Sequence, residues 1–167
     1  ALKIIESKDK IPYSTIKGNH VFNFWQDDIH IRGIWRRTSL EEYKKPKPDW
    51  EILLDIDKLA EIENENWVWK GSHLLPKDYN RCILSLSRGG KDATVLREYD
   101  IPQKCFVTNG FQSPEAKSGI SWINENAVFV STEFGSGSLS DSGYPTIVKL
   151  WKRGEPLSDA QVIMQID

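Results

Sequence analysis

The sequence predicts an all-β protein and, within that class, a partial β-propeller of about three four-stranded antiparallel blades. Two observations predict the class. Short apolar runs rich in β-branched and aromatic residues follow one another, bounded by Gly, Asn, Asp or Pro, and no long helical pattern separates them. The third observation, a repeat of roughly 50 residues, is typical of propeller blades.

The first repeat unit covers about residues 11–57. Its apolar runs predict strands at 21–25, 33–38 and 50–56. The run at 21–25 ends where Asp27 and Asp28 break the alternation. We expect a short surface helix at 57–62, where good helix formers follow an aspartate that can cap them.

The second unit covers about residues 66–107 and the third about residues 120–166. Strands are predicted at 67–69, 82–86, 94–99 and 105–107, and again at 120–122, 127–130, 147–151 and 161–166. Equivalent strands of the three units align at apolar positions: Phe22, Ile83 and Phe129 in the second strand, Trp35, Leu96 and Val148 in the third, and Leu53, Phe106 and Ile163 in the fourth.

Several predicted strands are apolar on both faces. Leu53 is flanked by Ile52 and Leu54, and the run at 161–166 has the same character. A sheet packed between neighbouring blades needs this pattern, whereas a sheet with one wet face alternates. Because propellers close with about four to eight blades, we expect the chain to be a fragment of a larger propeller.

The composition excludes several classes of protein. The 22 Lys and Arg against 24 Asp and Glu give a formal net charge of −2, unlike a nucleic-acid binder with a broad basic face. No apolar run approaches the roughly 20 residues of a membrane helix, and residues 1–6 lack the layout of a signal peptide. We therefore expect neither nucleic acid nor membrane as a partner, and a cytoplasmic protein, with the periplasm as the alternative.

Residues that often carry chemistry lack the spacing that the chemistry needs. His20, His30 and His73 have no HExxH, HxH or CxxC pattern around them, so no metal or cofactor is predicted. Ser142 follows Asp141 and precedes a glycine, but the chain has no G-x-S-x-G elbow. We therefore predict no catalytic residue in this chain.

Cysteine and tryptophan pairs have structural interpretations. Cys82 and Cys105 lie in apolar runs, so we expect buried free thiols rather than a disulfide. Trp67 and Trp69 point to one face of their strand, either as part of the core or as a stacking platform for a sugar or prolyl ring.

Three further features leave alternatives open. Arg36 and Arg37 are adjacent in a predicted strand and must point to opposite faces of the sheet. Either one is a surface arginine and the other is paired locally, or one of them reaches a partner domain. Residues 135–143 form a long flexible connection, either a solvated loop or a mobile gate. A propeller glycosidase, which needs two carboxylates facing one pocket, is a minor alternative. Its candidate carboxylates include Asp27, Asp28, Asp55 and Asp57.

Several strings together resemble the N-terminal propeller of the prolyl oligopeptidase family of serine peptidases, in its bacterial type. They are NFWQDD at 23–28, RGIWRRT at 32–38, ENWVWKG at 65–71, LSLSRGG at 84–90, SGISW at 118–122, and GSL and SGYP within 137–145. The similarity runs from about residue 20 to residue 167.

The resemblance implies a seven-bladed propeller that caps an α/β-hydrolase domain carrying a Ser-Asp-His triad. The chain would then be roughly the first three blades, a non-catalytic, substrate-gating part of an enzyme that cleaves short peptides. In such enzymes the loop equivalent to 135–143 lies toward the domain interface. The alternative is a non-enzymatic propeller that binds a protein partner. Exposed blade edges would favour self-association.

Overall fold

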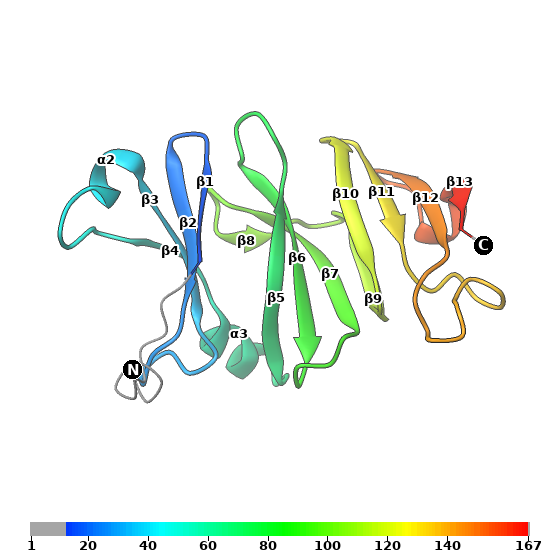
Figure 1. Ribbon diagram of the computed structural model, residues 1–167, viewed down its shortest axis with the longest axis horizontal. Coiled ribbons are helices and arrows are strands. Elements are labelled where there is room, and N and C mark those ends of the chain that lie inside the picture. The colour runs from blue at the N-terminus through cyan, green and yellow to red at the C-terminus, as the bar shows by residue number, and fades with distance from the viewer. Residues whose placement is uncertain (1–12, 167) are drawn as a thin grey trace. The chain divides into compact units, whose positions relative to one another are not determined.

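Figure 1 shows the computed structural model, which describes residues 13–166. The expectations for residues 1–6 and for the start of the first repeat unit at 11–12 lie outside the described residues. The chain forms two compact units, and the boundary between them falls after Trp69, inside strand β5 (Trp67–Leu74).

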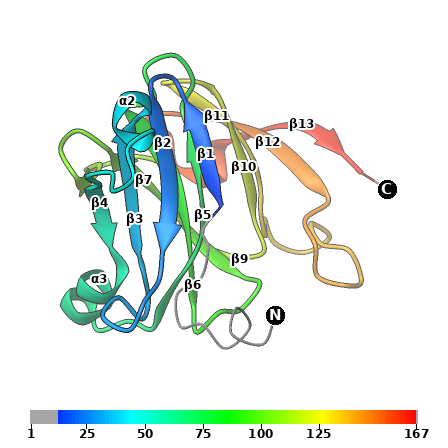
Figure 2. The same cartoon turned by 60° about the vertical axis from the view of Figure 1, so that its left-hand side comes forward.

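The first unit contains an antiparallel sheet in which β1, β2, β3 and β4 follow one another in sequence order (Figure 2). The strands are β1 (Ser14–Lys17), β2 (His20–Trp25), β3 (Ile34–Ser39) and β4 (Glu51–Asp55). The three predicted strands are confirmed. Helix α2 (Leu40–Tyr43), which was not predicted, is a single turn capped by the side chain of Ser39.

Helix α3 (Ile56–Glu63) begins one residue earlier than the predicted segment at 57–62. Its N-cap is Asp55, whose carboxylate accepts a hydrogen bond from the Lys58 amide at 3.1 Å. The predicted short helix is confirmed, and one side of α3 packs on the core while the other is exposed. The buried residues are Ile56, Leu59 and Ala60.

Stacked aromatic rings form the core of the first unit. Trp35 is buried and stacks on Phe22, with ring centroids 5.9 Å apart. Trp69 lies 5.2 Å from Trp35 and 5.0 Å from Phe24, parallel to the latter. Trp67 is also buried. The core interpretation of Trp67 and Trp69 is therefore confirmed.

The second unit completes two more antiparallel sheets. One has the order β5–β6–β7–β8, with β9 also paired to β7, and the other has the order β10–β11–β12–β13. The remaining strands are β6 (Arg81–Arg88), β7 (Thr94–Asp100), β8 (Cys105–Phe106), β9 (Gln112–Ala116), β10 (Gly119–Asn124), β11 (Ala127–Ser131), β12 (Ile147–Lys152) and β13 (Gln161–Gln165). A short 3-10 helix, η1 (Leu157–Asp159), precedes β13.

The outer strand of the β5–β9 sheet differs from the single strand predicted at 105–107. It is divided into β8, which pairs with the end of β7, and β9, which pairs with the beginning of β7. Between them, residues 107–111 leave the ladder but stay tied to Glu98. The Val107 amide donates to the Glu98 carbonyl at 3.0 Å, and the Glu98 amide donates to the Phe111 carbonyl at 2.9 Å.

A shared core fills the space between the two sheets of the second unit. Its buried members are Ile83, Leu96, Phe111, Ile120, Val128, Val130, Trp151 and Ala160. Strand β6 is buried at every position from 82 to 87, on both of its faces. This confirms the prediction of stacked sheets with apolar residues on both sides of a strand.

Some predicted core positions are exposed. All of β13 is exposed, and so are Ile52 and Cys105. These residues belong to outer strands, which have a neighbouring strand on one side only. The prediction of a buried thiol is therefore confirmed for Cys82 and wrong for Cys105. None of the helices within residues 13–166 is long and apolar enough to cross a membrane.

Candidate functional site

The loops of the second unit gather at two opposite ends of its sheets (Figure 1). Because the strands are antiparallel, the β5–β6, β7–β8 and β10–β11 connections lie at one end, which we call the pocket end. The β6–β7 and β11–β12 connections lie at the other, which we call the hairpin end. The hairpin end contains residues 135–143, where the sequence suggested a gate.

Residues 138–146 form a hairpin, a local structure that the composition of the segment did not predict. The buried Ser138 hydroxyl donates to the Gly135 carbonyl at 2.6 Å, and the Thr146 amide donates to the Ser138 carbonyl at 3.0 Å. Leu139 and Pro145 form an isolated β-bridge. Main-chain hydrogen bonds therefore give this segment a defined shape.

The tip of the 138–146 hairpin is held from two sides. The Ser140 amide donates to the Tyr144 carbonyl at 2.8 Å, and Gly143 has φ +82°, a left-handed conformation that favours glycine. Lys117, from the turn before β10, donates to the Ser142 carbonyl at 3.1 Å and lies 4.2 Å above the Tyr144 ring. The tip is thus an exposed but structured protrusion.

At the pocket end, a fully buried carboxylate joins the two sheets. The Glu98 side chain on β7 has no solvent exposure. Arg153, which follows β12, donates to both of its oxygens, at 2.8 and 3.0 Å, and Arg81 on β6 donates at 2.8 Å. Arg153 also binds the Glu125 carbonyl through Nε and Nη2. Each of the two arginines is therefore fixed by the same carboxylate.

The chain excursion at 107–111 encloses this carboxylate. The Phe111 amide donates to Glu98 Oε1 at 2.9 Å. A Cβ at Gly110 would stand 2.9 Å from both Glu98 Oε1 and the Val107 Cβ, so only glycine fits. Burial raises the pKa of the Glu98 carboxyl, but the hydrogen bonds from Arg153, Phe111 and Arg81 outweigh it and hold that pKa below its usual range.

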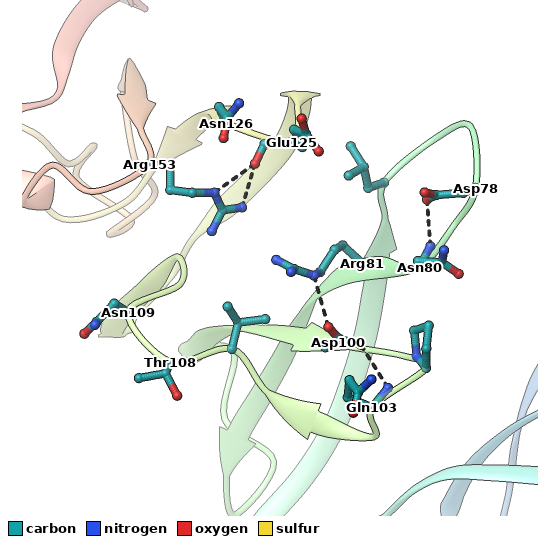
Figure 3. Close-up of a pocket in the computed structure, with 13 residues that line it drawn as sticks. Asp78, Asn80, Arg81, Asp100, Gln103, Thr108, Asn109, Glu125, Asn126 and Arg153 are labelled. Atoms are coloured by element: carbon teal, nitrogen blue, oxygen red, sulfur yellow. Dashed lines mark hydrogen bonds and ion pairs between the residues drawn. The ribbon is translucent and has the colours of Figure 1, made fainter.

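A pocket of about 730 Å³ opens beside the buried carboxylate (Figure 3). Arg81, Asp100 and Arg153 form part of its wall, and the loops at 75–80, 102–103, 107–109 and 125–126 supply the rest. Its lining is mainly polar and contains several carboxamide side chains. These are Asn80, Gln103, Asn109 and Asn126.

The aspartates considered for glycosidase chemistry have structural roles. Asp27 accepts hydrogen bonds from backbone amides in its own turn, that of His30 above all, and these bonds lower its pKa. Asp28 is exposed in the same turn. Asp55 caps α3, and Asp57 accepts from a backbone amide of the β2–β3 loop. None of these bonds indicates a catalytic role for the aspartates.

Arg36 and Arg37 point to opposite faces of the first sheet, as predicted. The Arg36 guanidinium lies between the rings of Trp25 and Trp50, at 4.7 and 4.2 Å from their centroids. Arg37 forms an ion pair with Glu51 at 3.2 Å. Both contacts are local, and they fix the two side chains on the first sheet.

The histidines lie apart in different local settings. The His30 ring is 3.1 Å from Asp27, and His20 packs edge-on to a phenylalanine. Burial lowers the pKa of His73, whose carbonyl accepts a hydrogen bond from the Trp122 indole at 2.8 Å. Within residues 13–166, no three His, Cys, Asp or Glu side chains gather closely enough to hold a metal ion.

Comparison with known proteins decides the family. Residues 1–167 match the family model described as the prolyl oligopeptidase N-terminal beta-propeller domain. The chain belongs to this family. It is 41% identical over 166 residues to the uncharacterized peptidase y4nA of Sinorhizobium fredii. The aligned segment covers 99% of this chain and 23% of that relative.

Bacterial relatives and solved structures extend the comparison. The uncharacterized peptidase RP174 of Rickettsia prowazekii is 32% identical over 171 residues, or 98% of this chain and 24% of that protein. A post-proline cleaving enzyme from Rickettsia typhi superposes with a TM-score of 0.87 at 35% identity, over 94% of this chain and 24% of that one. This propeller chain therefore spans about a quarter of the length of these relatives.

A more distant structure supports the fold alone. Oligopeptidase B from Leishmania major has a TM-score of 0.74 at 14% identity, over 95% of this chain and 21% of that one. The successive four-stranded meanders of the chain are thus those of a partial propeller, as predicted from the sequence. The Glu98 cluster was not predicted. Glu98 lies two residues after Leu96 and so on the same face of its strand, and a glutamate on an apolar strand face needs a buried partner for its charge.

Proposed function

We propose that this chain is the substrate-gating part of a prolyl-oligopeptidase-type serine peptidase that cleaves short peptides. The observation that carries the proposal is the family match over residues 1–167, together with stacked antiparallel sheets of the propeller type. In this proposal the chain itself is non-catalytic, and the whole enzyme acts by acyl transfer through a serine nucleophile. The propeller admits short peptides and excludes folded proteins by size.

The 138–146 hairpin is the segment that we assign to gating. It is exposed at its tip, yet held by main-chain bonds and by Lys117, so it can act as a fixed obstacle. We place this hairpin near the catalytic domain because the equivalent loop of the enzymes that the sequence resembles lies toward the domain interface. A rigid obstacle at that place limits access by its shape, without any chemistry of its own.

Gating can be tested in the peptidase that carries this propeller. Residues 139–145 are replaced by a Gly-Gly link, with Arg88→Lys at the same end of the unit as a matched control. We expect the shortened hairpin to raise cleavage of long peptides relative to a short chromogenic prolyl peptide, while the control keeps the parental ratio. An unchanged ratio in the shortened variant would contradict the gating role.

The chain alone should give no turnover of a chromogenic prolyl peptide. The proposal assigns the serine nucleophile to another domain, so hydrolysis is expected only when that domain is present. The measurement is release of the chromophore by the purified chain. The full-length post-proline cleaving enzyme from Rickettsia typhi is the positive control. A rate that persists through repurification and scales with chain concentration would overturn the assignment.

We also propose that the chain self-associates through its exposed apolar strands. Val162, Ile163 and Met164 on the outer strand β13 are each about half exposed. Clustered apolar surface of this kind favours association. Light scattering behind a sizing column should show a dimer or larger species, which Val162→Lys with Met164→Lys shifts toward monomer. A monomer that is unchanged on dilution argues against this proposal.

A further inference from the structure

One arginine of the first sheet carries a charge that no carboxylate within residues 13–166 binds. The Arg36 guanidinium donates through Nε to Asn23 Oδ1 at 2.8 Å and lies between the rings of Trp25 and Trp50. Asn23 is itself buried. These contacts fix the position of the guanidinium and leave Nη1 and Nη2 without an acceptor among the described residues.

Asp27, whose charge acts on Arg36, is already bound elsewhere. Its Oδ2 accepts a hydrogen bond from the Trp25 indole at 2.8 Å, and its Oδ1 accepts one from the His30 amide at 2.6 Å. Burial lowers the pKa of the Arg36 guanidinium, and the charge of Asp27 opposes that shift without cancelling it. Because buried charges in proteins are normally paired, Arg36 calls for a second anion.

The outer edge of the Arg36 guanidinium is open to a partner. Within the described residues, the enclosed polar side-chain atoms without a hydrogen bond are the hydroxyls of Ser87 and Ser113, so Nη1 and Nη2 are reached by solvent. Two neighbouring N–H donors of a guanidinium match the two oxygens of a carboxylate. Since the tryptophan rings already hold the group, little conformational freedom is lost when a carboxylate binds.

The surroundings of Arg36 have the composition of a protein interface. Ile52 pairs with Arg36 across β3 and β4 and is 45% exposed, and Tyr43 packs edge-on to Trp50 and is 43% exposed. Trp, Tyr and Arg are the side chains that contribute most at contacts between proteins. The opposite face of the same sheet is covered by Trp69. A protein surface with one carboxylate among apolar groups therefore fits the Arg36 face.

We propose that Arg36 binds an aspartate or glutamate side chain from the segment of the full-length protein that follows residue 167. The chain spans about a quarter of the length of its relatives, and its three sheets are fewer than a closed propeller needs. A further sheet is therefore expected against the first one, and the charge of Arg36 fixes how it docks. This occupant rests on one part of the proposed function, that the chain belongs to a larger enzyme.

Chemical modification of arginine tests the docking. Phenylglyoxal is applied to the isolated chain and to the full-length protein, and mass spectrometry gives the rate at each arginine. We expect Arg36 to react about tenfold more slowly in the full-length protein, because its Nη atoms are then bound. Arg37, paired with Glu51 of this chain, is the internal control and should react alike in both. The proposal is overturned by an equal rate at Arg36 in both proteins, or by protection that rises with the concentration of the isolated chain, the mark of a second copy.

A variant separates the carboxylate from simple burial. Arg36→Met keeps an unbranched side chain between the two rings and removes the charge, so it leaves a bound carboxylate without its partner. Hydrogen exchange of the β3 amides should then speed up about tenfold more in the full-length protein than in the isolated chain. Arg37→Met is the matched control and should have the same effect in both, because Glu51 belongs to this chain. An equal effect of Arg36→Met in both proteins would refute the carboxylate.

Docking and gating can fail independently. The modification rates need no turnover, so they are measured whether or not the hairpin limits access to an active site. Loss of the gating effect with Arg36 protected would refute the proposed gating and leave the docking contact. Intact gating with Arg36 equally reactive in both proteins would refute only the contact.

Discussion

Replacing Glu98 by alanine should destabilise the protein by ~3–5 kcal/mol, because removal of one member of a buried ion pair leaves its partners uncompensated. The substitution leaves Arg153 without its bidentate acceptor and Arg81 without its closest carboxylate. It also removes the acceptor of the Phe111 amide, which is buried. Urea unfolding followed by circular dichroism measures the loss.

Glu115→Ala is the matched control for this prediction. Glu115 also pairs with an arginine at 2.9 Å, Arg88, but both side chains are substantially exposed. Exposed pairs contribute little because water screens and solvates both charges. We therefore expect the control to unfold close to the parent. Equal losses in the two variants would show that burial of Glu98 does not have the energetic role assigned to it.

The Glu98 network also predicts how stability depends on pH. The pKa of Glu98 is lowered in the folded protein, so the folded state holds the charged form more strongly than the unfolded state does. Its contribution is therefore present above the ordinary glutamate pKa of about 4.3, and it is lost as the pH falls through the lower folded value. In Glu98→Gln, this part of the acid-induced loss should disappear.

The sequence predicts the strands well because each strand needs only a short local pattern. Val128 and Val130 alternate within five residues, and the sheet order follows from the meander. The Glu98 cluster depends instead on Arg153, which is 55 residues away in the sequence. No local pattern marks such a partner. For the same reason the division of the outer strand into β8 and β9 was not predicted.

The hairpin at 138–146 shows a second limit of sequence reasoning. Glycine and serine at 135–143 are typical of flexible loops, yet here serine hydroxyls and amides bind the main chain of the same segment. The amino-acid composition indicates how freely the backbone of a segment can change conformation. It does not report which hydrogen bonds select one of them, such as the bond from Lys117 to Ser142.

Trp35→Ala should cost the first unit ~3–5 kcal/mol, the range for removing a large aromatic side chain from a core. Trp35 is 2% exposed, and its ring lies between Phe22 and Trp69 at 5.9 and 5.2 Å. The deletion therefore leaves a cavity inside the aromatic core and ends the contact of Trp69 with β3. Circular dichroism in urea is the suitable measurement, because tryptophan fluorescence changes with the substitution itself.

Trp50→Ala provides the comparison within the same sheet. Trp50 is only partly buried and covers the Arg36 guanidinium at 4.2 Å, an interaction worth about 0.5–1 kcal/mol at exposed sites. The two variants remove the same side-chain atoms. The difference between their losses in free energy of unfolding therefore measures what burial of Trp35 in the core contributes. A loss at Trp35 no greater than at Trp50 would mean that the stacked rings do not hold Trp69 against Phe24 and Trp35. The face-covered packing on which the propeller interpretation of the first unit depends would then be wrong.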